Sequence, residues 1–274
     1  MEADRPFPVP YRSKLQDTID PGQTLTLKGQ TLEGVERWKV SFLCGSLSSG
    51  DVALHIEFRF DEGKIVLNHC VNGQWNEKER KEKLKYKKGA PFDVRIRAHN
   101  DKFEILIDRK EFAEYEYKVP LSQVSHIVVD GAIVLNTVLW GGRYYPVPYE
   151  AAINYGLTPG RKLFITGRPM GDRFHVNLVQ EDGDIQLHLN PRFKSKELVR
   201  NAQKDGQWQN EEKEGKFMFD KKENFDIIID NQSYAFQIFV NNERACTFAH
   251  RMDPNHVHGL QIGGEVELWG IHAL

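Results

Sequence analysis

The sequence predicts an all-β protein built from two similar domains, and two observations carry this prediction. Hydrophobic residues recur at a period of two along many short segments, and the chain contains an internal duplication. Its 274 residues suffice for two medium domains, each with a core of its own. A hydrophobic content of 40% and a charged content of 28% are ordinary for a globular protein.

The period-two alternation defines the strands. It is clearest at Val94–His99 and Phe103–Asp108 in the first half and at Phe236–Asn241 in the second half. Because successive side chains of a strand point to opposite faces, this pattern gives one apolar and one polar face. Turn signals such as Asp61-Glu62-Gly63 and Asn72-Gly73 recur every 8 to 12 residues. Many short strands with regular turns indicate a β-sandwich or a β-barrel.

The internal duplication sets the domain organisation. Pro8–Tyr11 recurs as Pro146–Tyr149, and Leu139–Gly141 recurs as Leu268–Gly270. The offset between the copies falls from 138 to 129 residues, so the second copy has shorter loops. Units of this size are complete domains rather than solenoid repeats. We expect the domain boundaries to be 1–143 and 144–274.

Composition and motifs exclude several classes of protein. A net charge of −2 gives no general attraction to nucleic acid or to an anionic membrane surface. No apolar run is long enough to span a membrane, and the N-terminal residues lack the apolar segment of a secretory signal, so we expect none. Three unpatterned cysteines predict reduced thiols. No metal-ligand spacing or dense acidic calcium loop occurs, so we expect neither a metal nor another cofactor.

A cluster of polar residues marks the second repeat. His188, Asn190 and Arg192 lie at i, i+2 and i+4, so on a strand all three face the same side. The first repeat has the same layout. In both repeats 13 residues separate the histidine from an asparagine (His55 to Asn68, His188 to Asn201), and 7 more lead to a tryptophan (Trp75, Trp208). The candidate site residues are His188, Asn190, Arg192, Asn201, Trp208, Glu211 and Lys213 in the second repeat, and His55, Glu57, Arg59, Asn68, Trp75, Lys78 and Arg80 in the first.

The pattern of these residues resembles the sugar-binding signature of the galectins, and its chemistry suits the galactose ring that this resemblance implies. Galactose has one apolar face of C–H bonds, and an indole laid against it removes apolar area from water. Trp75 and Trp208 are placed for this role. The axial 4-hydroxyl needs donors and acceptors that converge from one side, which histidine, asparagine and arginine on alternate strand positions supply.

The combined pattern His-x-Asn-Pro-Arg, Val-x-Asn and Trp-x-x-Glu-x-Lys resembles the sugar-binding signature of the galectins over nearly the whole chain, twice. The resemblance implies two jelly-roll-like sandwiches of antiparallel sheets, each with a sugar on its concave sheet. It also implies that the first three polar residues bind the 4-hydroxyl, that Asn201 and Glu211 bind the 6-hydroxyl, and that Arg192 and Glu211 reach the next sugar.

Both repeats depart from the family pattern. Lys213 stands where the family has arginine, so a point charge replaces a planar fork and contact with the second sugar is expected to weaken. In the first repeat Glu57 replaces asparagine and Lys78 replaces glutamate. Two arrangements are open. Either Glu57 and Lys78 form a charge-swapped pair, or the loop shifts and Glu77 or Glu79 takes the place of the missing acid.

The expected function is that of a bivalent lectin that binds and crosslinks lactose-type β-galactosides on glycoproteins and glycolipids without catalysis. A glycosidase would need two carboxylates flanking one bond, and repeat 2 offers only Glu211 with its neighbour Glu212 facing away. An interaction scaffold with vestigial sugar sites would keep its function when Trp208 becomes alanine. The resemblance further implies cytoplasmic synthesis with non-classical secretion, and self-association is left open.

Overall fold

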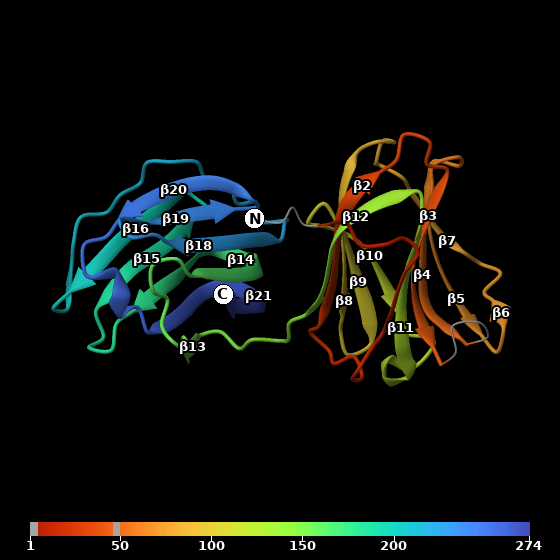
Figure 1. Cartoon of the computed structure of the whole chain (residues 1–274), viewed down its shortest axis with the longest axis horizontal. Coiled ribbons are helices and arrows are strands. Elements are labelled where there is room, and N and C mark those ends of the chain that lie inside the picture. Colours follow the sequence, from red (N-terminus) through yellow and green to blue (C-terminus); the bar gives the residue numbers. More distant parts are fainter. Residues whose placement is uncertain (1–4, 46–49) are drawn as a thin grey trace. The chain divides into compact units, whose positions relative to one another are not determined.

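A computed structural model describes residues 5–45 and 50–274 of the chain. The chain divides into two compact units, Met1–Arg143 and Tyr144–Leu274. Each unit consists of antiparallel strands arranged as two layers (Figure 1). The helical elements of the described residues are two short 3-10 turns, η1 (Leu121–Gln123) and η2 (Pro254–His256). The predicted all-β sandwich fold is confirmed.

The N-terminal unit has two separate sheets. The first sheet, in spatial order, contains β1 (Tyr11–Lys14), β11 (Val124–Gly131), β3 (Arg37–Cys44), β4 (Val52–Arg59), β5 (Lys64–Val71) and β6 (Gln74–Trp75), and β7 (Arg80–Lys83) also pairs with β5. The second sheet contains β10 (Lys110–Glu116), β9 (Lys102–Ile107), β8 (Pro91–Ala98), β2 (Thr24–Thr31) and β12 (Ile133–Gly141). The alternating segments of the sequence correspond to β8 and β9, as expected.

In the C-terminal unit two long strands pass through both layers. These are β14 (Lys162–Val179) and β21 (Gly259–Ala273), whose pairing is interrupted between Pro169 and Phe174. One layer is completed by β13 (Tyr149–Ala152), β15 (Ile185–Arg192), β16 (Glu197–Lys204) and β17 (Gln207–Trp208), and the other by β18 (Phe225–Asn231), β19 (Ala235–Val240) and β20 (Glu243–Ala249). The strand order therefore repeats that of the N-terminal unit.

Each unit has its own hydrophobic core, which the inward-facing residues of its strands form. In the N-terminal unit Trp38 stacks on Phe58 and Phe92, with ring centroids 4.0 and 4.6 Å apart. In the C-terminal unit Phe174 and Phe225 stack at 5.1 Å. Burial of such a side chain stabilises a fold by roughly 1.5–3 kcal/mol. Because the apolar residues of β4 and β15 are used in these cores, their polar residues lie on the outer face of the sheet.

Candidate functional site

The register of two neighbouring strands assembles the site of the C-terminal unit. His188 on β15 lies directly opposite Asn201 on β16. Leu187 and Leu189 point into the core, so His188 and Asn190 face the other side. Trp208 on β17 is 50% exposed, and its ring approaches that of His188 edge-on at 4.9 Å. One face of the sheet thus carries an accessible indole beside a row of polar groups.

The N-terminal unit repeats this arrangement. His55 on β4 lies opposite Asn68 on β5. Trp75 on β6 is 49% exposed, and its ring lies 5.1 Å from the ring of His55. The constant spacing from histidine to asparagine to tryptophan therefore has a structural cause, since it fixes the register of three adjacent strands. We call these two clusters the N-terminal site and the C-terminal site.

Arg192 is the centre of the charged part of the C-terminal site. Its Nε donates to Asn190 Oδ1 at 2.9 Å, and its Nη2 donates to Glu211 Oε1 at 2.6 Å. The hydrogen bond from Arg192 lowers the pKa of Glu211. Lys213 Nζ lies 3.6 Å from carboxylate oxygens of both Glu211 and Glu197. The site therefore holds an ionised carboxylate and a partly exposed guanidinium in a fixed mutual orientation.

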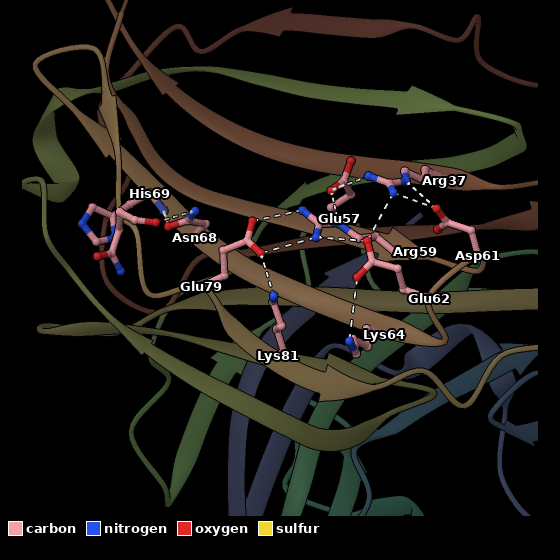
Figure 2. A network of polar contacts seen from close by, with 11 residues as sticks. Arg37, Glu57, Arg59, Asp61, Glu62, Lys64, Asn68, His69, Glu79 and Lys81 are labelled. Atoms are coloured by element: carbon pink, nitrogen blue, oxygen red, sulfur yellow. Dashed lines mark hydrogen bonds and ion pairs between the residues drawn. The ribbon is translucent and has the colours of Figure 1, made fainter.

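The N-terminal site contains a larger network of charges (Figure 2). Arg59 Nε donates to Glu57 at 2.5 Å, and both terminal nitrogens of Arg59 donate to Glu79, at 3.0 and 3.3 Å. Arg37 binds Asp61 at 2.7 Å and also reaches Glu62. Arg59 also donates to Glu62 at 3.4 Å, so it forms four hydrogen bonds, whereas Arg192 forms three, two of them to Glu211. Fewer donor hydrogens of Arg59 therefore remain for a ligand.

The expected pair between Glu57 and Lys78 does not form, and this expectation is corrected. Glu57 binds Arg59, whereas Lys78 and Arg80 line a separate pocket, in which Arg80 donates to the backbone oxygen of Glu114 at 2.6 Å. Glu79 occupies the position that Glu211 has in the other site. The loop after Trp75 is one residue longer than the loop after Trp208, and a shift of one residue moves every side chain of a strand to the opposite face.

A chain of hydrogen bonds fixes the ring of His188 in one protonation form. The carboxylate of Glu150 accepts from Gln261 Nε2 at 3.0 Å, and Gln261 Oε1 in turn accepts from Asn177 Nδ2 at 3.4 Å. Asn177 Oδ1 then faces His188 Nδ1 at 2.7 Å. A carboxylate only accepts, which orients each amide, so His188 carries its proton on Nδ1 and presents Nε2 as an acceptor.

The corresponding partner in the N-terminal site is a hydroxyl. Ser41 Oγ lies 2.8 Å from His55 Nδ1, and a hydroxyl can donate or accept. Burial lowers the pKa of both His55 and His188 to about 4. Both rings are therefore neutral at physiological pH, and each can accept a hydrogen bond from a ligand hydroxyl.

Several residues of the two sites were not identified from the sequence. Asn177 was missed although it lies only 11 residues before His188 in the chain and directly opposite it on the preceding strand, β14. A signal for it exists, since Asn177 continues the alternation of polar residues at Arg173 and His175 along this strand. Arg251 was also missed: it donates to Asn201 Oδ1 at 3.2 Å and to Glu212 at 2.8 Å, and so holds the loop after Trp208. Nothing local to Arg251 in the sequence indicates this contact.

The surroundings of the sites carry no other obvious chemistry. Within residues 5–45 and 50–274 no group of three or more His, Cys, Asp or Glu side chains is arranged to hold a metal ion. Cys44, Cys70 and Cys246 are buried and form no disulfide. No helix in the described part of the chain is long and apolar enough to cross a membrane.

Two sandwiches with the same polar cluster define the chain as a tandem-repeat protein. Residues 10–140 and 148–273 each match the family described as galactoside-binding lectin. The chain therefore belongs to the galactoside-binding lectins, or galectins, with two copies of the family domain. It is 50% identical to a 32 kDa beta-galactoside-binding lectin of Caenorhabditis elegans, over 99% of both chains. A protein of the same name from Haemonchus contortus is 52% identical over 96% of this chain and 94% of that one. Galectin-4 of Homo sapiens is 30% identical over 95% of this chain and 94% of that one.

Proposed function

We propose that the protein is a bivalent lectin that binds β-galactosides of the lactose and N-acetyllactosamine type through the N-terminal and C-terminal sites. Each of the units 1–143 and 144–274 acts as one carbohydrate-recognition domain. The observation that carries this proposal is the pairing, in both units, of an accessible indole with a neutral histidine, at ring distances of 5.1 and 4.9 Å.

The chemistry of the C-terminal site supports galactose over its epimers. An indole face accommodates the C–H face of a sugar ring, which exposes no hydroxyl on that side in galactose. The axial 4-hydroxyl then points toward the sheet, where His188 Nε2 accepts and Arg192 donates. Asn201 Nδ2 is already held by the backbone oxygen of Gln209 at 2.9 Å and has a second hydrogen for the 6-hydroxyl. An equatorial 4-hydroxyl would leave these groups unpaired.

The carboxylates of the sites support binding rather than catalysis. A glycosidase needs one carboxyl group that stays protonated near neutral pH, so its pKa must be raised. The hydrogen bonds from Arg59 and Arg192 have the opposite effect, since they lower the pKa of Glu79 and of Glu211. These acids orient arginine side chains, and the proposed function contains no bond-breaking step.

Two sites on one chain give the protein its effect on surfaces. Single sugar sites bind weakly, with a Kd of roughly 10 µM to 1 mM. Engagement of two glycans on one surface raises the apparent affinity by roughly 10² to 10⁴. Engagement of glycoproteins or glycolipids on two surfaces crosslinks them. Two sites on one chain suffice for crosslinking without self-association of the protein. Gel filtration tests separately whether the protein self-associates.

Cytoplasmic synthesis followed by non-classical secretion would bring the lectin to such glycans. Detection of the lectin in the medium of cells whose membranes are intact tests this route.

Isothermal titration calorimetry of the full chain with lactose tests the proposal, with cellobiose as the matched control. The two disaccharides differ only in the orientation of one 4-hydroxyl. We expect two lactose molecules per chain, one after Trp208→Ala, and none after Trp75→Ala combined with Trp208→Ala. Equal binding of cellobiose, or no heat with lactose at millimolar concentration, would refute the proposal.

A further inference from the structure

A strip of lysines lies beside the N-terminal site. Lys81 and Lys83 are exposed on β7, and Lys85 follows in the same alternation. The intervening Leu84 and Tyr86 pack against the core, which turns the neighbouring lysines outward. Lys64 on β5 lies directly opposite Lys83. We call Lys64, Lys81, Lys83 and Lys85 the basic strip.

The charge of the basic strip is not balanced within the protein. Lys81 lies 3.4 Å from Glu79, and Lys64 lies at the longer distance of 3.9 Å from Glu62. Neither Lys83 nor Lys85 forms an ion pair with any residue that the structure describes. Like charges directly opposite on neighbouring strands repel and destabilise a sheet. An anion placed between Lys64 and Lys83 would relieve this repulsion.

The C-terminal domain shows that the fold does not require this strip. Residues 78–88 contain seven basic and two acidic residues, whereas the corresponding residues 210–220 contain two basic and four acidic ones. The pairing register places Lys64 opposite Arg59 in the first domain and Glu197 opposite Arg192 in the second. The charge at this position is therefore reversed, and the chain has a basic strip beside one of its two sites only.

The basic strip continues directly from the N-terminal site. Lys81 contacts Glu79, which binds Arg59, and Figure 2 shows Lys81 and Lys64 at the border of this network. A strand rises about 3.3 Å per residue, so the successive lysines are spaced by about 7 Å. Cations at such regular intervals suit an extended ligand with repeated negative charges. Bases of single-stranded nucleic acid would need exposed aromatic rings, but Tyr86 is turned toward the core.

We propose that the basic strip binds sulfate groups of a glycan whose galactoside occupies the adjacent N-terminal site. The inference rests on the proposed galactoside binding and adds to it a preference for sulfated chains in one domain. Coulombic attraction at an exposed surface is screened by salt, so the preference falls as ionic strength rises. Lactose carries no sulfate and does not depend on the strip.

The test uses the full chain with Trp208→Ala, which leaves the N-terminal site as the only reporter. Its affinity is measured for a keratan sulfate oligosaccharide and for the same oligosaccharide after desulfation, at 50 and 500 mM NaCl. We expect about tenfold tighter binding of the sulfated form at 50 mM and no difference at 500 mM. Lys83→Gln with Lys85→Gln should abolish the advantage and leave lactose binding unchanged. The matched control, Lys216→Gln with Lys222→Gln, should retain it.

Two outcomes would overturn the inference while the proposed function stands: lactose binding without any preference for sulfate, or a preference that survives Lys83→Gln with Lys85→Gln. Equal affinity for a DNA duplex or for phosphatidylserine vesicles would also overturn it, since the strip would then attract any polyanion. Absence of lactose binding would instead refute the proposed function itself. Thermal unfolding of each variant verifies that these exposed substitutions leave the protein folded.

Discussion

Replacing Glu79 with glutamine should weaken the N-terminal site, whereas the same change at Glu77 should not. Glu79 accepts two hydrogen bonds from Arg59, at 3.0 and 3.3 Å, while Glu77 is exposed in the same loop. Glutamine has one acceptor oxygen and keeps one of these two bonds, and a hydrogen bond to a charged group such as the one that is lost contributes about 1.5–3 kcal/mol. A loss of about 1.5–3 kcal/mol corresponds to roughly 10- to 150-fold weaker binding of lactose.

The assay is a lactose titration of the full chain labelled with ¹⁵N-tryptophan, followed by NMR. The indole signals of Trp75 and Trp208 report the two sites separately in one sample, so the C-terminal site is an internal control. Glu77→Gln removes the same charge from the same loop and should change the affinity less than twofold. The reasoning is refuted if Glu77→Gln weakens the Trp75 response as much as Glu79→Gln does.

Three further predictions concern pH, a supporting arginine and a backbone bend. Because burial lowers the pKa of His55 and His188 to about 4, the folded protein resists protonation that the unfolded chain accepts near pH 6.5. The free energy of unfolding should therefore fall between about pH 6.5 and about pH 4, by on the order of 1–3 kcal/mol per histidine. The affinity for lactose should stay constant down to about pH 5. A midpoint of the binding affinity near pH 6.5 in calorimetry would contradict this. Arg251→Met removes a donor to Asn201 and should weaken lactose binding about fivefold at the C-terminal site alone, as the two indole signals would show. Gly264 has a φ of +95°, and an added Cβ would lie 2.8 Å from a backbone atom of the adjacent strand. Gly264→Ala should therefore lower the Tm by about 5–10 °C in a calorimetric scan. An unchanged Tm would show that an alanine fits this bend without strain.

The sequence was sufficient for the fold and for the strand-borne part of each site. Period-two alternation identified β8, β9 and β19, and the duplication identified two similar units. The spacing from His188 to Asn201 is informative because a tight hairpin joins their strands, and the hairpin fixes which residues lie opposite each other. Local sequence therefore determines local register, and local register determines which side chains share a face.

The same reasoning left two arrangements open where the spacing changes by one residue. Counting from Trp75 placed Lys78 and Arg80 in the site, whereas the structure shows the alternative of a shifted loop, with Glu79 bound to Arg59. A loop conformation depends on contacts that a residue count does not contain. Partners from distant segments, such as Arg251 for Asn201, depend on which parts of the chain become neighbours in the fold, and only the folded topology shows this.

A crystal soaked in lactose would show whether an exposed indole and a neutral histidine acceptor together select the galactose ring. We predict galactose stacked on Trp208, with its 4-hydroxyl within hydrogen-bonding distance of His188 Nε2 and of the Arg192 guanidinium. A disaccharide bound elsewhere on the chain, or a galactose ring turned so that its 4-hydroxyl faces solvent, would contradict this role of Trp208 and His188.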